Sequence, residues 1–170
     1  GNEAGLIDMA GYKKPEYFFR QSLWSEKPMI YVGTSKPFRR LNLRNGRHGM
    51  ARPLWNYEQG DSVNVYCYTN CEKATLFLNN TSLGTRYQDD STHVIMWRVA
   101  YQPGTLTVRA VKDGKAVADQ IVTHGQADQI KVQSRALNAR VGDRKIYAVD
   151  MQITDSRSVA VRTESVRLSL

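Results

Sequence analysis

The chain has 170 residues, of which 41% are hydrophobic and 24% charged, and these ordinary globular fractions exclude a largely disordered chain and a coiled coil. It contains no run of about 18 apolar residues, so the sequence offers no candidate transmembrane helix. The formal net charge of +8 permits binding to a polyanion without establishing it.

The N-terminal region predicts a loop followed by a short helix. Pro15 suits the first position of a helix, where its missing N–H would have had no intrahelical partner. No helix breaker follows until Pro28, and the intervening residues are unusually aromatic. A helix of about 11 residues is marginal by itself in water, so we expect its rings to be buried against another part of the protein.

Residues 36–52 form a basic stretch, which we interpret as an irregular linker or inserted loop. Its cationic residues are Lys36, Arg39, Arg40, Arg44, Arg47 and Arg52. Arginine clusters can bind phosphates, sulfates or carboxylates, whereas the alternative is a solvated loop whose charge pairs with acidic residues of a further domain. Only Phe38 offers a ring for stacking on single-stranded nucleic acid, so we favour the solvated loop and expect no nucleic acid.

From about residue 61 the hydrophobicity alternates with a period of two, which is typical of half-buried antiparallel strands. The alternation predicts strands near residues 63–69, 74–79, 82–87, 92–100, 105–112 and 116–123. Asn79-Asn80 and Asp113-Gly114 are tight-turn signals between them. We therefore predict an all-β fold, an immunoglobulin-like β-sandwich over residues 54–125 with a short N-terminal helical segment.

A second group of strands is predicted after Gly125, at residues 129–134, 145–154 and 165–170. About 45 residues remain for it, well short of the roughly 100 that a complete sandwich requires. We therefore expect residues 126–170 to be part of a second domain whose exposed sheet edge favours self-association.

Few residues indicate metal or redox chemistry. If Cys67 and Cys71 lie on one extended strand, their Cα atoms are about 13 Å apart, too far for a disulfide, so both are expected to be reduced. The three histidines fall on unrelated elements, which does not favour a metal site. Asp89-Asp90 could bind Ca²⁺, but a solvated loop between strands is the preferred interpretation. We expect no metal and no cofactor.

Several separate motifs occur in a fixed order along the chain. They are residues 5–15, 21–24, 28–29, 55–56, 65–72, 76–79, 82–84, 97–106 and 112–115. Together they resemble the end of the catalytic barrel and the following immunoglobulin-like domain of glycoside hydrolase family 2, which includes bacterial β-galactosidases and β-glucuronidases. The resemblance implies a barrel remnant at residues 1–35, a basic linker at 36–53, a sandwich at 54–125 and the opening of the next module at 126–170. Asn80 departs from the Gly usual in the family's turn.

The resemblance also implies where the chemistry lies. A retaining glycosidase needs two carboxyl groups about 5–5.5 Å apart on rigid elements. The family carries these glutamates on earlier barrel strands, and none of this chain's glutamates matches the catalytic motifs. They are Glu3, Glu16, Glu26, Glu58, Glu72 and Glu164. We therefore expect no catalytic residue in this chain and a glycoside hydrolase as the parent protein.

Aromatic residues are the remaining candidates for contact with carbohydrate, since pyranose faces pack on rings. Trp97 is expected in the core, and Trp24 is expected at an interface between its helix and the barrel. Trp55 and Tyr57, at the entry to the sandwich, are the best candidates for exposed rings, with interdomain packing preferred to sugar binding.

The leading hypothesis is a non-catalytic accessory segment of a family 2 glycoside hydrolase acting in carbohydrate degradation. The alternative is a carbohydrate-binding module that holds polysaccharide near the parent active site. The expected partners are the parent catalytic barrel, with carbohydrate and a second copy of the chain as further candidates, and no membrane. The segment carries no signal sequence, and we expect a periplasmic or secreted bacterial parent.

Overall fold

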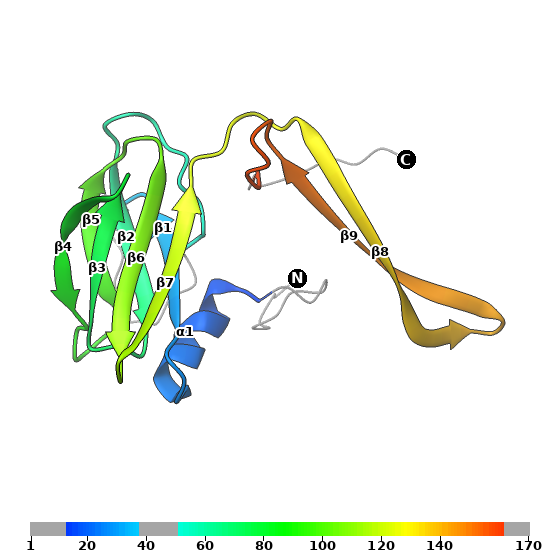
Figure 1. The fold of residues 1–170 in the computed structure, drawn as a ribbon, viewed down its shortest axis with the longest axis horizontal. Helices are drawn as coiled ribbons and strands as arrows, with labels where there is room; N and C mark the ends of the chain where they lie inside the picture. Colours follow the sequence, from blue (N-terminus) through cyan, green and yellow to red (C-terminus); the bar gives the residue numbers. More distant parts are fainter. Residues whose placement is uncertain (1–12, 38–50, 162–170) are drawn as a thin grey trace. The chain divides into compact units, whose positions relative to one another are not determined.

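The computed structural model describes residues 13–37 and 51–161, and within them it contains one helix and nine strands (Figure 1). They are α1 (Pro15–Trp24), β1 (Ile30–Ser35), β2 (Ser62–Thr69), β3 (Lys73–Leu78), β4 (Thr81–Tyr87), β5 (Ile95–Ala100), β6 (Thr105–Lys112), β7 (Lys115–Val122), β8 (Gln129–Val141) and β9 (Arg144–Thr154). The chain divides into two compact units, Gly1–Thr123 and His124–Leu170. The prediction of an all-β fold with a short N-terminal helix is confirmed.

The first unit is a β-sandwich of two antiparallel sheets with strand orders β1-β2-β5 and β4-β3-β6-β7 (Figure 1). Every second residue of β2, β3 and β6 points between the sheets, as the alternation predicted. The resulting core contains Val32, Trp55, Val63, Val65, Cys67, Ala74, Leu76, Ile95, Trp97, Tyr101, Leu106, Val108 and Ile121, among others. Each sheet has one apolar face, and the two sheets bury these faces against each other, which produces the sandwich.

The two predicted tight turns are present. Asn79 and Asn80 have φ values of 51° and 65°, and Asp113 and Gly114 have 51° and 73°, the left-handed pairs that a two-residue hairpin turn requires. The side chain of Asn79 adds a second function, because its Oδ1 accepts a hydrogen bond from Thr105 N at 2.8 Å and its Nδ2 donates to Pro103 O at 3.1 Å. The β3–β4 turn is therefore joined to the start of β6.

Strand β1 was not predicted by the alternation, and the structure shows why. Residues 31–35 are all buried, so the strand has no polar face to produce a period of two. One face packs in the core, while on the other the Ala51 carbonyl lies so close to Gly33 that a Cβ there would overlap it. β1 lies within residues 1–35, the segment that the resemblance assigned to a barrel remnant. In the structure it pairs along its whole length with β2 of the sandwich, and its Val32 N donates to Asp119 Oδ2 of β7 at 2.8 Å.

Helix α1 packs on the outer face of the three-stranded sheet. Phe18 stacks on Tyr31 with ring centroids 4.6 Å apart, and Phe19 meets Tyr68 edge to face at 5.5 Å. The expectation that this helix buries aromatic rings is thus confirmed for one of its faces. Ser22, on the same face of the helix, is also buried. The last two residues of the helix, Leu23 and Trp24, are exposed. With ten residues, the single helix of the described ranges is too short to traverse a bilayer.

The second unit consists mainly of the long β8–β9 ribbon (Figure 1). Direct pairs such as Val132 with Met151 and Ala136 with Tyr147 place the apolar side chains of both strands on the same face. That apolar face, which also carries Ile130, Val149 and Ile153, is largely exposed within the described residues. The predicted strand at residues 165–170 lies outside the described residues.

Candidate binding and interface sites

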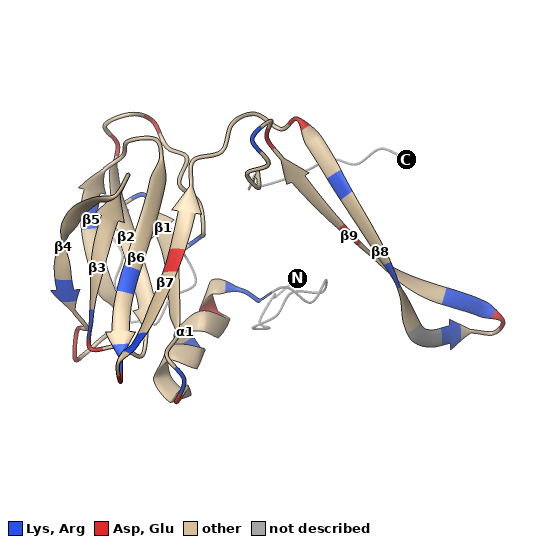
Figure 2. Cartoon of the chain, in the orientation of Figure 1, with Lys and Arg blue, Asp and Glu red and all other residues tan. Residues whose placement is uncertain are grey.

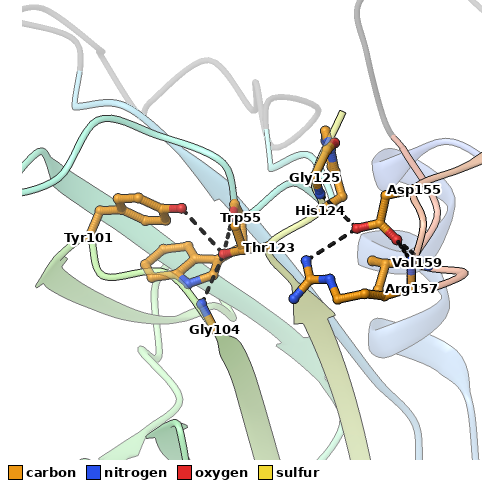
Figure 3. A network of polar contacts seen from close by, with 9 residues as sticks. All are labelled: Trp55, Tyr101, Gly104, Thr123, His124, Gly125, Asp155, Arg157 and Val159. Atoms are coloured by element: carbon orange, nitrogen blue, oxygen red, sulfur yellow. Dashed lines mark hydrogen bonds and ion pairs between the residues drawn. The ribbon is translucent and has the colours of Figure 1, made fainter. Parts of the chain in front are cut away.

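Trp55, one of the three aromatic candidates, is fully buried. Its ring lies 5.0 Å from the Tyr101 ring and 6.0 Å from the Tyr57 ring, both edge to face, and its Nε1 donates to Gln102 O at 3.0 Å. Thr123 Oγ1 donates to the Trp55 carbonyl at 2.8 Å and holds the backbone in place (Figure 3). The prediction that Trp55 is an exposed ring is therefore wrong, because the ring closes one end of the sandwich core.

Tyr57 is half-buried beside Trp55 and Tyr101. Its hydroxyl lies 2.7 Å from Thr34 Oγ1, so the polar end of the side chain is engaged inside the protein. Burial raises the pKa of the Tyr57 hydroxyl above its usual value, against the opposing effect of the Thr34 hydrogen bond. Tyr57 thus contributes mainly to packing at this end of the sandwich.

Trp24 is the candidate that the structure leaves open to solvent. It ends α1 with 68% of its surface exposed, next to Leu23, which is also exposed. The two residues form an apolar patch beyond the aromatic cluster that holds the helix on its sheet. An exposed Trp beside an exposed Leu is typical of a surface that contacts another protein domain.

Among the acidic residues within the described ranges, Asp61 makes a local ion pair. Asp61 pairs with Lys36 at 2.7 Å, and this hydrogen bond raises the pKa of Lys36 and lowers that of Asp61. The four described glutamates are Glu16 in α1 and Glu26, Glu58 and Glu72 in connecting segments. Within residues 13–37 and 51–161, no group of three or more His, Cys, Asp or Glu residues is arranged to hold a metal ion.

The basic stretch lies mostly outside the described residues. Of its six cationic residues, only Lys36 and Arg52 can be placed. Arg52 exchanges backbone hydrogen bonds with Thr34 at 2.7 and 3.1 Å, so the end of the stretch is attached to β1. Elsewhere, Lys and Arg positions are scattered over strands of both units (Figure 2).

Both cysteines are free and buried. Cys67 faces the core as the alternation predicted, and Cys71 is buried too, although it follows the end of β2. Burial raises the pKa of the Cys67 thiol far above its usual value, so the sulfur stays protonated and is a poor nucleophile or metal ligand.

Asp89 lies in the loop between β4 and β5, which confirms the loop interpretation. Its Oδ1 accepts hydrogen bonds from the backbone of Thr92 at 2.7 Å, from the Thr92 hydroxyl at 3.0 Å and from Ser91 N at 3.0 Å. These bonds lower the pKa of Asp89 and hold a turn in which His93 has a positive φ. Consequently β5 begins at Ile95 rather than near residue 92.

Asp155 organises the second unit and was missed by sequence reasoning. Its carboxylate accepts hydrogen bonds from Gly125 N at 2.7 Å, from Val159 N at 2.9 Å and from Arg157 N at 2.9 Å, and Arg157 Nη2 lies 3.2 Å away (Figure 3). The bond from Gly125, followed by those from the 157–159 turn, lowers the pKa of Asp155 to about 2. The only signal in the sequence was the position of Asp155, directly after the alternating segment that forms β9 and at the start of a polar turn.

Comparison with known proteins gives one family match and several relatives. A family described as a domain of unknown function (DUF4982) matches residues 60–118, which extend from the start of β2 to the middle of β7. The matched part therefore lies within the sandwich.

Two curated relatives match nearly the whole chain. Beta-galactosidase BoGH2A of Bacteroides ovatus is 28% identical over 156 residues, which are 90% of this chain and 16% of that protein. A putative beta-glucuronidase of Formosa agariphila is 30% identical over 158 residues, which are 89% of this chain and 13% of that protein. The chain thus spans less than a fifth of the length of these relatives.

Among solved structures, a glycosyl hydrolase family 2 member from Bacteroides cellulosilyticus superposes with a TM-score of 0.79 and 21% identity. The match covers 94% of this chain and 22% of that chain. At this identity the likeness supports the fold alone.

Proposed function

We propose that this chain, a segment related to glycoside hydrolase family 2 proteins, is a non-catalytic accessory segment of such an enzyme. The observation that carries the proposal is the pair of coverages: the relatives match about 90% of this chain, yet the chain spans only 16% and 13% of their lengths. A segment of that size leaves most of each relative to supply the active site. We propose that the parent is a β-galactosidase-like or β-glucuronidase-like enzyme of a bacterium, exported to the periplasm or secreted.

The arrangement of acidic residues supports a non-catalytic role. The four described glutamates lie in α1 and in separate connecting segments, whereas glycoside hydrolysis needs two carboxyl groups on rigid elements facing one sugar ring. Asp61, Asp89 and Asp155 are each engaged in a local ion pair or turn. These residues stabilise the chain, and the proposal assigns the reacting carboxylates to the remainder of the parent.

The structural task that we propose is to contact the catalytic barrel. Helix α1 is attached to the sandwich by Phe18 and Phe19, while Leu23 and Trp24 face outward. A helix that is held on the sandwich by its aromatic side and exposes two apolar residues at its C-terminal end can connect the barrel to the sandwich. Carbohydrate binding through Trp55 and Tyr57 is not supported, because these rings pack inside the unit.

Two measurements test this function. The purified chain is incubated with chromogenic β-galactosides and β-glucuronides, and we expect no turnover. Hydrolysis that is abolished by substituting one of its own glutamates would overturn the proposal.

In the parent enzyme, Trp24→Ala should lower the melting temperature of the catalytic part and leave KM unchanged, because an interface ring is lost away from the substrate. Val111→Ala, an exposed apolar residue on β6 of the sheet that α1 does not cover, is the control. Equal melting temperatures for the two variants would refute the contact.

A further inference from the structure

A groove of about 310 Å³ lies at one lateral edge of the sandwich, where the end of β4 approaches β5. Its walls include Tyr66, Arg86, Tyr87, Asp89, Thr92 and Met96. The volume is at the lower end of the roughly 300–1,000 Å³ typical of small-molecule sites. Apart from Asp89, which the sequence offered as a possible Ca²⁺ ligand, none of these residues was a candidate, because they come from three strands of two different sheets and from the connecting turn.

The apolar part of the groove follows from strand pairing. Tyr66 of β2 and Met96 of β5 are direct partners, so both side chains point away from the core on the same outer face. Tyr87, the last residue of β4, is 62% exposed, although Lys73 Nζ lies over its ring at 5.7 Å from the centroid, and Met96 is 39% exposed. An accessible aromatic face beside a methionine offers a surface for the C–H face of a sugar ring.

The polar part of the groove contains a donor and an acceptor. Arg86 Nη1 donates to Met96 O at 3.0 Å, which positions the guanidinium at the groove while its other N–H groups make no further bond within the described residues. Asp89 uses Oδ1 to hold its turn, and its Oδ2 accepts no hydrogen bond within the same ranges. A groove lined by a guanidinium donor and a carboxylate acceptor offers partners for the hydroxyl groups of a sugar, each of which can both donate and accept.

The groove is held in place before any ligand arrives. The Tyr66 hydroxyl accepts hydrogen bonds from Ser35 Oγ and Asn64 Nδ2, both at 3.3 Å. Gln88 Nε2 donates to Thr69 O at 2.9 Å and to His93 O at 3.1 Å, which fixes both ends of the turn that carries Asp89. Preorganisation of this kind reduces the entropic cost of binding.

We propose that this groove binds a neutral pyranose unit of a glycan, with Tyr87 against the ring face and Arg86 and Asp89 on adjacent hydroxyl groups. The carboxylate of Asp89 disfavours phosphates and other anions, which would face its negative charge. A larger hollow of about 600 Å³ on the outer face of the four-stranded sheet is less suitable, because its two charged residues, Lys73 and Arg109, are both cations and it has no carboxylate acceptor. The groove adds a binding function to the proposed accessory role, and its failure would not affect that role.

The test is a titration of the whole chain with methyl β-galactopyranoside, followed by backbone amide chemical shifts. We expect saturable shifts confined to residues 86–96 and the neighbourhood of Tyr66, with a dissociation constant on the order of 1 mM. Tyr87→Ala should weaken binding about tenfold through loss of the stacked ring. Asp89→Asn should weaken it by a similar factor while keeping the Oδ1 acceptor that the turn requires. Arg109→Ala, in the larger hollow, is the control and should bind as the parent chain does.

Three results would overturn the proposal. They are the absence of saturable shifts up to about 100 mM sugar, unchanged affinity in both groove variants, and shifts centred on Phe77 and Arg109 instead.

A second titration, with methyl β-glucuronide, tests the preference for neutral sugars. Its carboxylate should be repelled by Asp89, so we expect weaker binding than for the galactoside. Tighter binding of the glucuronide than of the galactoside would refute the assignment to neutral sugars. Amide spectra of each variant without sugar establish that it is folded.

Discussion

The two units of this chain are built from the same sequence pattern with different outcomes. In the sandwich, the apolar residues of β2, β3 and β6 are buried between two sheets. In the β8–β9 ribbon, the same alternation leaves Val132, Tyr147 and Val149 more than half exposed. Alternation therefore identifies which face of a strand is apolar, while a second layer is needed to bury that face.

The difference also concerns how each unit is held together. The sandwich has a shared core closed at one end by Trp55 and Tyr101. The ribbon depends on its own backbone ladder and on the turn gathered around Asp155. A two-stranded ribbon is marginally stable by itself in water, so local polar contacts carry more weight there than in the sandwich.

The largest effect that separates the units should come from truncating a core side chain. Leu76→Ala removes a fully buried side chain between the sheets and should lower the free energy of unfolding by about 3 kcal/mol. Val132→Ala in the exposed ribbon should change it by less than about 0.5 kcal/mol. All three tryptophans precede residue 124, so urea unfolding followed by Trp fluorescence reports on the sandwich, and amide exchange reports on the ribbon.

A large effect of Val132→Ala on the protection of the ribbon amides from exchange would contradict the difference between the two units. It would mean that the apolar face of the ribbon is covered in solution, for example by a second copy of the chain. Measuring the variant at two protein concentrations distinguishes the cases, because self-association makes the loss depend on concentration.

A smaller effect is expected at the β3–β4 turn of the sandwich. Asn79→Ala removes the side-chain bonds to Pro103 and Thr105 and places Ala at a positive φ, which together should cost about 2 kcal/mol. The neighbouring Asn80→Gly keeps those bonds and relieves the positive φ, so it should be neutral or stabilise by about 0.5 kcal/mol. Thermal unfolding of both variants checks the pair, and equal losses would argue against the clamp by Asn79.

The smallest global effect, confined to the ribbon, should come from Asp155. Its folded-state pKa is about 2, below the ordinary value of 3.8, so its stabilising effect is present above pH 3.8 and is lost as the pH falls through about 2. The amides of Gly125 and Val159 should lose protection from exchange over that range, while Trp fluorescence at neutral pH stays unchanged in Asp155→Asn. Asp143→Asn, in the β8–β9 turn, is the matched control; loss of protection in both variants would contradict this role.

The strands with one polar face were predictable from the sequence, and so were the two hairpin turns. β2, β3 and β6 agree with their predicted positions to within one residue at each end, because burial on one face alone imposes a period of two. β1 escaped detection because both of its faces are covered. The start of β5 was misplaced because a local carboxylate, Asp89, stabilises a turn within an apparently continuous segment.

The candidate sites were less predictable. Trp24, Trp55 and Tyr57 were grouped by residue type, yet Trp55 is buried and Trp24 is exposed. The groove at Tyr66, Arg86 and Asp89 combines residues of both sheets and a turn. Local sequence contains no information on which distant strand edges meet, so this combination could not be read from spacing.

The sequence by itself determined the strands that have one polar face, their apolar sides, the tight turns and the resemblance to family 2 glycoside hydrolases, since these depend on short-range pattern or on motif order. Only the tertiary structure decided which aromatic rings are buried, which sheet α1 covers and which strands of the two sheets line the groove. Those features depend on packing between segments separated by tens of residues, and many sequences with the same alternation could satisfy that packing in different ways.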